Sequence, residues 1–290
     1  MTPTIVTYPE GDESAACTIT ALPELVEGSW CVVTDRTPFH PLDPWWPDQP
    51  SDRGEVAVTG SARVPVERAV LVGVDVASGA MRLNSDKSVK RADAAWQWSV
   101  GHVVGRQASP GFQVGQPIEL FVDHAYRTAI ACGHTGCHVA AIALNAVTAP
   151  YWDRTIRLDS LGNPDTDQQL IGESRIVEYG SVDRYRIGKS ARKAGLASGR
   201  FWADFDGLGA EIERRANEIV AEIRQISVEP VGTSFHERRM WKARLGARTL
   251  EMPCGGVHTA DPRMLLPMSI RLERLGADEF QMKTFVPGAG

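Results

Sequence analysis

The sequence predicts an α+β fold, in which a small antiparallel β-barrel-like domain at residues 1–120 precedes an α+β zinc-binding domain at residues 121–290. Short β-branched runs separated by turn residues fill the first region, as in small barrels and sandwiches. A long stretch rich in Ala, Ile and Leu begins the second region and predicts a helix. The second region also contains two pairs of histidine or cysteine residues, each pair four residues apart, which indicate a metal site.

The strands predicted in the first region are residues 30–34, 54–59, 69–76 and 102–105, and residues 112–123 are expected to form a turn and then a strand. Between them lies segment 37–50, with five prolines and the adjacent Trp45 and Trp46. Proline lacks the backbone donor that a helix or a central strand needs. We therefore expect a rigid loop whose aromatic side chains cover other residues.

Two long helices are predicted in the second region. The first covers residues 125–147, is capped by Asp123, and is expected to be interrupted or bent near Gly133 and Gly136. The second covers residues 208–226, because apolar side chains recur there at helical spacing. A further short element is expected around Leu265, Met268 and Ile270.

Length and composition are those of an ordinary globular protein: 290 residues, 43% hydrophobic, 23% charged, with a net charge of −5. The start of the chain has no signal-peptide pattern, and no apolar run approaches the ~20 residues of a membrane span. Five cysteines without paired spacing argue against a disulfide framework. We therefore expect a cytoplasmic protein with no membrane partner.

Two basic stretches lie in the second region. One contains Arg184, Arg186, Lys189, Arg192, Lys193 and Arg200, and the other contains Arg238, Arg239, Lys242, Arg244 and Arg248. A solvated surface explains most such clusters. Their place in the metal-binding half nevertheless favours a polyanionic ligand, and a local field can bind one even when the net charge is negative.

The metal motifs are His134-Thr-Gly-Cys-His138 and Cys254-Gly-Gly-Val-His258. On a helix, residues four apart share a face, so His134 and His138 would point together. Each motif alone is weak, but three imidazoles and one thiolate are the ligand set of a tetrahedral zinc site. Four protein ligands usually mean a closed structural site, so the motifs leave catalysis open and assign no general base.

Several segments, in this order, resemble the AlaX-type trans-editing proteins and the editing domain of alanyl-tRNA synthetase. They are Asp35-Arg-Thr-Pro-Phe-His-Pro, Asp52-Arg-Gly54, His102-Val-Val, Gly115, Val122-Asp123, Arg127, both metal motifs, the segment Arg200-Phe-Trp-Ala-Asp-Phe, and the following helix from Glu211-Ile-Glu. The resemblance implies a zinc-dependent deacylase of mischarged aminoacyl-tRNA, with His134, His138, Cys254 and His258 as zinc ligands. It also implies that the basic stretches contact acceptor-stem phosphates, and no DNA partner is expected.

The sequence departs from the family pattern where the family shapes its substrate site. Residues 43–50 replace a glycine-rich segment, His40 replaces a tyrosine, Lys193 lies in a segment that replaces glutamine–x–glycine–serine, and Val257 replaces a threonine. The residues predicted to contact substrate are His40, Trp45, Trp46, Lys193, Gly255 and Gly256. The expected substrate is therefore either seryl- or glycyl-tRNA(Ala), or a specialised threonyl- or fluorothreonyl-tRNA.

Because 290 residues leave no room for a synthetase domain beside these regions, the expected enzyme acts in trans. Two other functions fit the same motifs. One is a zinc hydrolase of a small ester or amide without tRNA binding. The other is a noncatalytic, zinc-stabilised RNA-binding module that would unfold without its metal.

Overall fold

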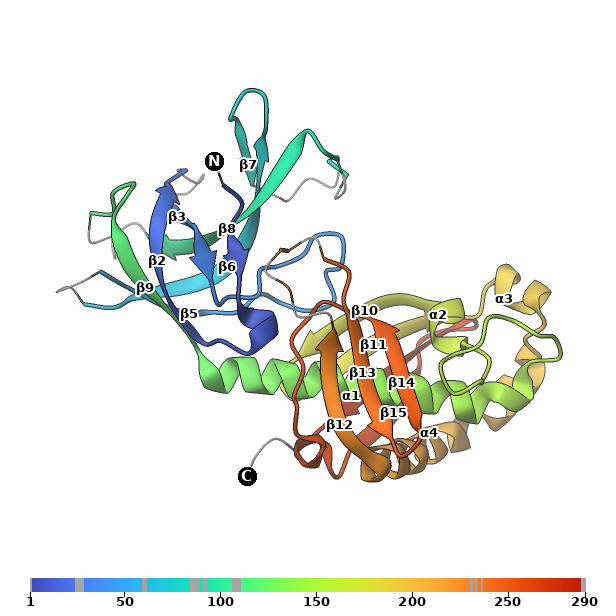
Figure 1. The fold of residues 1–290 in the computed structure, drawn as a ribbon. Coiled ribbons are helices and arrows are strands. Elements are labelled where there is room, and N and C mark those ends of the chain that lie inside the picture. Colours follow the sequence, from blue (N-terminus) through green and yellow to red (C-terminus); the bar gives the residue numbers. More distant parts are fainter. Residues whose placement is uncertain are drawn as a thin grey trace. The chain divides into compact units, whose positions relative to one another are not determined.

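The computed structural model describes residues 2–23, 29–58, 62–83, 89–90, 93–105, 111–229, 232, 234–235 and 237–287. Its architecture is mixed α and β, as predicted, and two compact units divide the chain (Figure 1). Unit 1 comprises Met1–Arg127 with Pro230–Arg238, and unit 2 comprises Thr128–Glu229 with Arg239–Gly290. The first division lies between Arg127 and Thr128, within a helix, and unit 1 also includes a short later segment.

Unit 1 is built on an antiparallel sheet, with strand order β5-β9-β2-β3-β8-β6-β7 among the described residues. Strand β5 also pairs with β6. The strands are β2 (Ser14–Ala21), β3 (Ser29–Thr34), β5 (Gly54–Val58), β6 (Val64–Asp75), β7 (Met81–Leu83), β8 (Trp96–Gly105) and β9 (Pro117–Val122). A separate parallel pair joins β1 (Ile5–Val6) to β4 (Arg36–Thr37), and the 3-10 helix η1 (Tyr8–Glu10) follows β1.

The predicted strands of the first region are confirmed, since they fall in β3, β5, β6, β8 and β9. Thr59, the predicted end of one strand, lies outside the described residues. The prediction omitted β2, which lacks a continuous apolar run and alternates polar with buried residues. Segment 38–50 forms a loop with one isolated bridge at Leu42, as its prolines require.

Unit 2 contains two antiparallel sheets in the part of the chain that is described. The β11 sheet has the order β10-β11-β16-β15, and the β13 sheet has the order β12-β13-β14. Their strands are β10 (Ile171–Val177), β11 (Gly180–Arg186), β12 (Ile223–Glu229), β13 (Met240–Leu245), β14 (Arg248–Pro253), β15 (Ser269–Arg274) and β16 (Glu279–Phe285). The helices are α1 (His124–Thr148), η3 (Ala149–Tyr151), α2 (Thr166–Leu170), α3 (Lys189–Ala194), α4 (Ser198–Glu222) and η4 (Pro262–Leu265).

Helix α1 is continuous, so the predicted interruption near Gly133 and Gly136 is wrong. Gly133 serves a close contact instead, because a Cβ there would lie 2.4 Å from the carbonyl oxygen of Val177 and 2.6 Å from that of Gly180. The glycine lets the helix touch the turn between β10 and β11. The predicted cap is confirmed, since the backbone N–H of Tyr126 donates to Asp123 at 3.0 Å.

With η3, α1 is long and apolar enough to cross a membrane by length and composition, contrary to the sequence expectation. Most of its most apolar stretch is buried inside the structure, as in the core helix of a soluble protein.

Helix α4 begins at Ser198 and ends at Glu222, whereas the sequence predicted residues 208–226. The prediction started late because Gly199, Gly207 and Gly209 lower helix propensity. Packing overrides that propensity, because Phe201 and Phe205 extend the buried face of the helix by two turns. At the other end, β-branched Ile223 and Ile226 continue the apolar pattern but belong to β12.

Helix α1 lies beside both sheets of unit 2 (Figure 1). Its contacts with them fix which of its faces carries the ligands. Its Gly133 face meets the β11 sheet. Its His138 ring lies 5.0 Å, centroid to centroid, from the ring of Trp241 on β13. The histidines of the first motif therefore point towards the β13 sheet, whose last strand leads into the second motif at Cys254.

Candidate metal centre

The fold brings the two predicted motifs together. The candidate ligand atoms of His134, His138, Cys254 and His258 all lie within 4.8 Å of one another. Helix α1 supplies two imidazoles one turn apart, and the loop after β14 supplies the thiol and the third imidazole. His134 and Cys254 are buried, whereas His138 and His258 are partly buried. These residues form a buried group that can bind a metal ion.

Two of the distances between ligand atoms in the group fit a tetrahedral zinc site. Tetrahedral zinc, with Zn–N near 2.0–2.1 Å and Zn–S near 2.3 Å, places its ligand atoms about 3.3–3.6 Å apart. The sulfur of Cys254 lies 3.4 Å from Nε2 of His134 and 3.2 Å from Nε2 of His258. The sulfur is therefore at ligand distance from two imidazoles on two different segments.

Thr135 fixes the tautomer of His258. Its hydroxyl donates to the carbonyl of Ala131 at 2.8 Å, so its single hydrogen is used there. The same oxygen accepts from the backbone N–H of Thr259 and lies 3.2 Å from Nδ1 of His258. Nδ1 must therefore carry the hydrogen, which leaves the Nε2 lone pair facing Cys254.

His138 gives the most direct indication that this group binds a metal ion. Its Nε2 is buried and has no hydrogen-bond partner among the described residues. Burial lowers the pKa of His138 to about 3, so the ring is neutral at physiological pH and its lone pair is available. An unsatisfied buried nitrogen requires an explanation, and a metal ion at this position supplies one.

The glycines of the second motif have different roles. The backbone N–H of Gly256 points to the sulfur of Cys254 at 3.4 Å, a contact that favours the thiolate. Gly255 is exposed, and a Cβ added to it would meet no atom within 4 Å. Of the two glycines predicted to contact substrate, Gly256 is thus tied to the ligand sulfur, and Gly255 has no steric need to be glycine.

Sequence reasoning missed Trp241. Its side chain is fully buried on β13, and its ring lies 5.0 Å from that of His138 and 6.0 Å from that of His258. The only signal in the sequence is the alternation of Trp241, Ala243 and Leu245, which identifies a buried strand face but gives no proximity to the histidines.

The other cysteines and histidines have structural environments. All five cysteines, each within the described part of the chain, are free and buried. Burial raises the pKa of Cys132 to about 11, and Cys137 faces away from the metal group, as predicted, with its thiol 3.5 Å from the buried carboxylate of Asp183. His102 lies in unit 1, and His124 is exposed and paired with Glu13 at 2.6 Å.

Three predicted substrate residues lie in unit 1, and the metal group lies in unit 2. His40 is buried, with Nδ1 3.2 Å from the side-chain amide of Gln49 and its ring against Tyr8. Trp45 packs edge to face against Trp98, with ring centroids 4.8 Å apart, which confirms that this loop covers other residues. Trp46 is half exposed, and its indole N–H donates to Asp48.

Lys193 lies near the C-terminal end of α1, far from the ligands on that helix. It is on α3, next to the segment where the backbone N–H of Asp153 donates to the carbonyl of Gly195. Asp153 follows the end of α1, and Thr148 lies ten positions after His138, or about 15 Å along the helix. No contact among the described residues joins Lys193 to the metal group.

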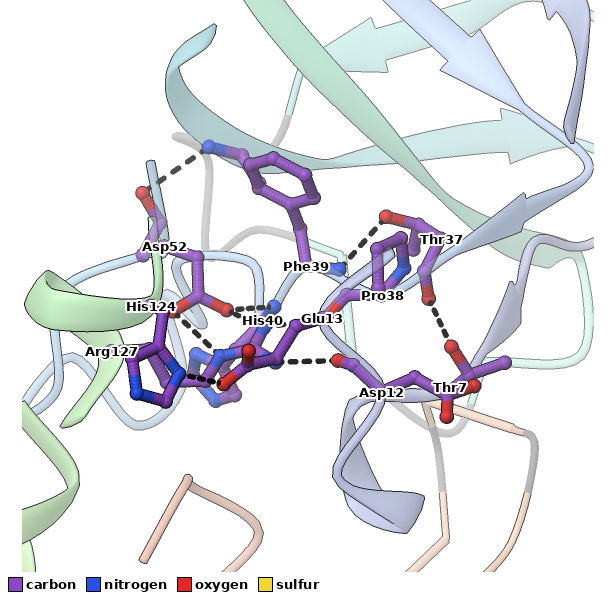
Figure 2. Close-up of polar contacts among 12 residues, drawn as sticks. Thr7, Asp12, Glu13, Thr37, Pro38, Phe39, His40, Asp52, His124 and Arg127 are labelled. Carbon is purple, nitrogen blue, oxygen red and sulfur yellow. Dashed lines mark hydrogen bonds and ion pairs between the residues drawn. The ribbon is translucent and has the colours of Figure 1, made fainter. Parts of the chain in front are cut away.

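Unit 1 contains a buried ion pair that the sequence suggested only through the family arginine (Figure 2). The guanidinium of Arg127 donates through Nε and Nη2 to the two carboxylate oxygens of Asp52. It also donates to the backbone carbonyls of Asp12 and Pro38. The same carboxylate accepts from the backbone N–H of His40 at 2.6 Å. The pair joins the start of α1 to the proline-rich loop.

The basic stretches are partly neutralised in three dimensions. Residues outside each stretch supply carboxylates to most of the cations. The pairs are Arg184–Glu173, Arg186–Glu279, Arg192–Asp278, Arg200–Asp153, Lys242–Glu229 and Arg248–Glu222. Lys189 and Lys193 have no ion pair within the described residues. They lie on α3, and the guanidinium of exposed Arg154 reaches the Lys193 carbonyl.

No protein-family model matches the chain, and no curated protein matches it either.

Proposed function

We propose that this chain is a zinc-dependent, trans-acting aminoacyl-tRNA deacylase of the AlaX type. The observation that carries the proposal is the buried group of three imidazoles and one thiol, assembled from two motifs 120 residues apart. The order of the flanking segments, from Asp52 and Arg127 to Cys254, supports an editing site over a small zinc knuckle. Unit 1 would be the barrel-like module, since β5 pairs with both β9 and β6.

His134, His138, Cys254 and His258 would hold the zinc. Bound zinc supplies Lewis-acid chemistry, which polarises an ester carbonyl or activates water. The chain's own residues prepare the ligands: Thr135 holds the tautomer of His258, and the Gly256 N–H stabilises the sulfur as thiolate. Burial keeps His138 neutral, as a ligand must be.

The tRNA would be held by the cations that remain without a carboxylate. Lys189, Lys193 and Arg154 are exposed around α3 and have no ion pair in the described part of the chain. Three such charges suit phosphates, and contacts of this kind weaken as salt is raised. Lys193 would then bind the tRNA backbone rather than the amino acid.

The amino acid would be selected by the segments that depart from the family pattern. In the sequence, the proline-rich loop has Trp45 and Trp46 where the family has glycines, and Nδ1 of His40 lies 3.2 Å from the side-chain amide of Gln49. Seryl- and glycyl-tRNA(Ala) are the ordinary substrates of this class. Because the loop is altered, threonyl- or fluorothreonyl-tRNA is the alternative substrate that we propose.

The test is a panel of tRNAs charged with Ser, Gly, Ala, Thr or fluorothreonine, assayed with wild type, His138→Ala and His124→Ala. Wild type should bind about one zinc and hydrolyse at least one substrate. His138→Ala should lose zinc and lower the rate by roughly 10²–10³-fold or more, because a group that stabilises developing charge is lost. His124→Ala removes an exposed histidine from the same helix and should keep both properties.

Other outcomes separate the alternatives. No turnover on the panel despite stoichiometric zinc would contradict the deacylase. Hydrolysis of minimal aminoacyl esters without tRNA binding would identify a small-ester hydrolase. Binding of tRNA without hydrolysis, together with unfolding on zinc removal, would identify the noncatalytic module. Lys193→Glu should weaken tRNA binding and flatten its salt dependence, and an unchanged salt slope would remove Lys193 from the phosphate contacts.

A further inference from the structure

The metal group has a second buried polar atom without a partner. Nε1 of Trp241 is buried and makes no hydrogen bond to the described residues. The side chain is fully buried, and its ring borders those of His138 and His258. The ring that carries this unsatisfied donor thus borders the ring of His138, whose Nε2 is also unsatisfied, and the two rings come from different elements.

A metal ion explains only one of these two atoms. It takes the lone pair of His138 Nε2, and this satisfies that nitrogen. Indole Nε1–H is a donor only, so it needs an acceptor lone pair, which a cation does not offer. A buried donor left without an acceptor is unfavourable.

We propose that the Trp241 indole N–H donates to an oxygen of a small molecule bound beside the metal, and that this molecule carries a carboxylate or an ester carbonyl. The inference rests on the metal centre of the proposed function. It assigns the centre an open position, which a closed four-ligand structural site lacks. Trp241 would contact the ligand and orient its oxygen.

Trp202 provides a matched control within unit 2. Its Nε1 is also buried without a partner in the described part of the chain. Its ring packs among Phe201, Phe205 and Phe280, with the guanidinium of Arg274 4.3 Å above it. Trp241 differs from it by its ring contacts with His138 and His258. Trp202 makes no ring contact with the ligand histidines among the described residues, so its N–H should not affect a ligand at the metal.

The experiment loads the full chain with Co²⁺ and titrates acetate, following the visible d–d bands of the metal. Wild type should bind acetate with a change in these bands. Trp241→Phe keeps the aromatic packing and removes the N–H, and it should weaken acetate binding by roughly ten- to a hundredfold, the scale of a hydrogen bond to a charged acceptor. Its affinity for Co²⁺ should be unchanged, and Trp202→Phe should match wild type.

A spectrum that acetate does not alter, or equal acetate affinity in wild type and Trp241→Phe, would overturn the inference. If Trp241→Phe does not fold, the indole ¹⁵N–¹H signals of the wild-type zinc protein supply the test. The signal most broadened when Co²⁺ replaces zinc should be the one that acetate shifts, and a signal that stays in place overturns the inference. Neither readout uses tRNA, so acetate binding without deacylation would contradict only the proposed function.

Discussion

The Asp52–Arg127 pair of unit 1 and the metal group of unit 2 are both buried polar clusters, and they differ in whether the chain satisfies them. Arg127 donates to Asp52 and to two backbone carbonyls, and the Asp52 carboxylate also accepts from the His40 N–H (Figure 2). In unit 2, Nε2 of His138 and Nε1 of Trp241 are buried without partners in the described part of the chain. The first cluster is complete without a ligand, whereas the second is not.

This difference separates a structural cluster from a binding site. Buried polar groups in proteins are nearly always hydrogen-bonded, so a complete network argues for architecture and an incomplete one argues for a ligand. His102 shows the same contrast with His138. Burial lowers the pKa of both histidines, but Nδ1 of His102 donates to the carbonyl of Val32 at 2.9 Å and its Nε2 lies 2.8 Å from the Thr37 hydroxyl.

The largest expected effect comes from breaking the complete cluster. Asp52→Ala leaves the buried Arg127 guanidinium without its carboxylate and should lower the free energy of unfolding by about 3–5 kcal/mol in urea titrations. Zinc content should be unchanged. Glu13→Gln, which removes the negative charge beside the exposed His124, should cost at most about 1 kcal/mol. Equal costs for the two variants would contradict a structural role for the Asp52–Arg127 pair.

A smaller effect is expected at the incomplete cluster. Thr135→Val removes the oxygen that accepts from Nδ1 of His258 and should weaken zinc affinity about 10- to 100-fold in chelator competition. Thr135→Ser keeps that oxygen and should bind zinc like wild type. If the valine variant kept full affinity, the hydroxyl would have no part in orienting His258.

The sequence predicted the ligands but not their surroundings, because the two depend on different distances along the chain. His134 and His138 are linked by helical spacing, and Cys254 and His258 belong to one short motif, so both pairs can be identified locally. Trp241 reaches His138 only through the packing of β13 against α1. That contact depends on the tertiary fold, and no local pattern encodes it.

The helices show the same limit. Helix α1 was predicted to within one residue at each end, because its long Ala-, Ile- and Leu-rich run is a local signal. The start of α4 was missed because its glycines oppose a helix that is stabilised by the packing of Phe201 and Phe205. The strand Ile223–Glu229 was partly assigned to that helix, because Ile223 and Ile226 fit both periods.

The smallest expected effect is a pH dependence in unit 1. Burial lowers the pKa of His102 to about 4, below its value of about 6.5 in an unfolded chain. Between these values the unfolded state binds a proton that the folded state does not, so stability falls as the pH falls, by at most about 1.4 kcal/mol per pH unit. His102→Gln removes this slope, so its destabilisation relative to wild type should shrink from pH 7 to pH 5. A constant difference between the two proteins would contradict a neutral, satisfied His102.

The central claim, that the incomplete cluster is a metal centre, is tested most directly by X-ray absorption at the zinc edge of the zinc-loaded protein. We expect about one zinc per chain, with one sulfur at about 2.3 Å and three imidazole nitrogens at about 2.0–2.1 Å, from Cys254 and from His134, His138 and His258. An additional light-atom ligand would agree with an open position. Zinc bound without sulfur, or well below one equivalent, would contradict the account.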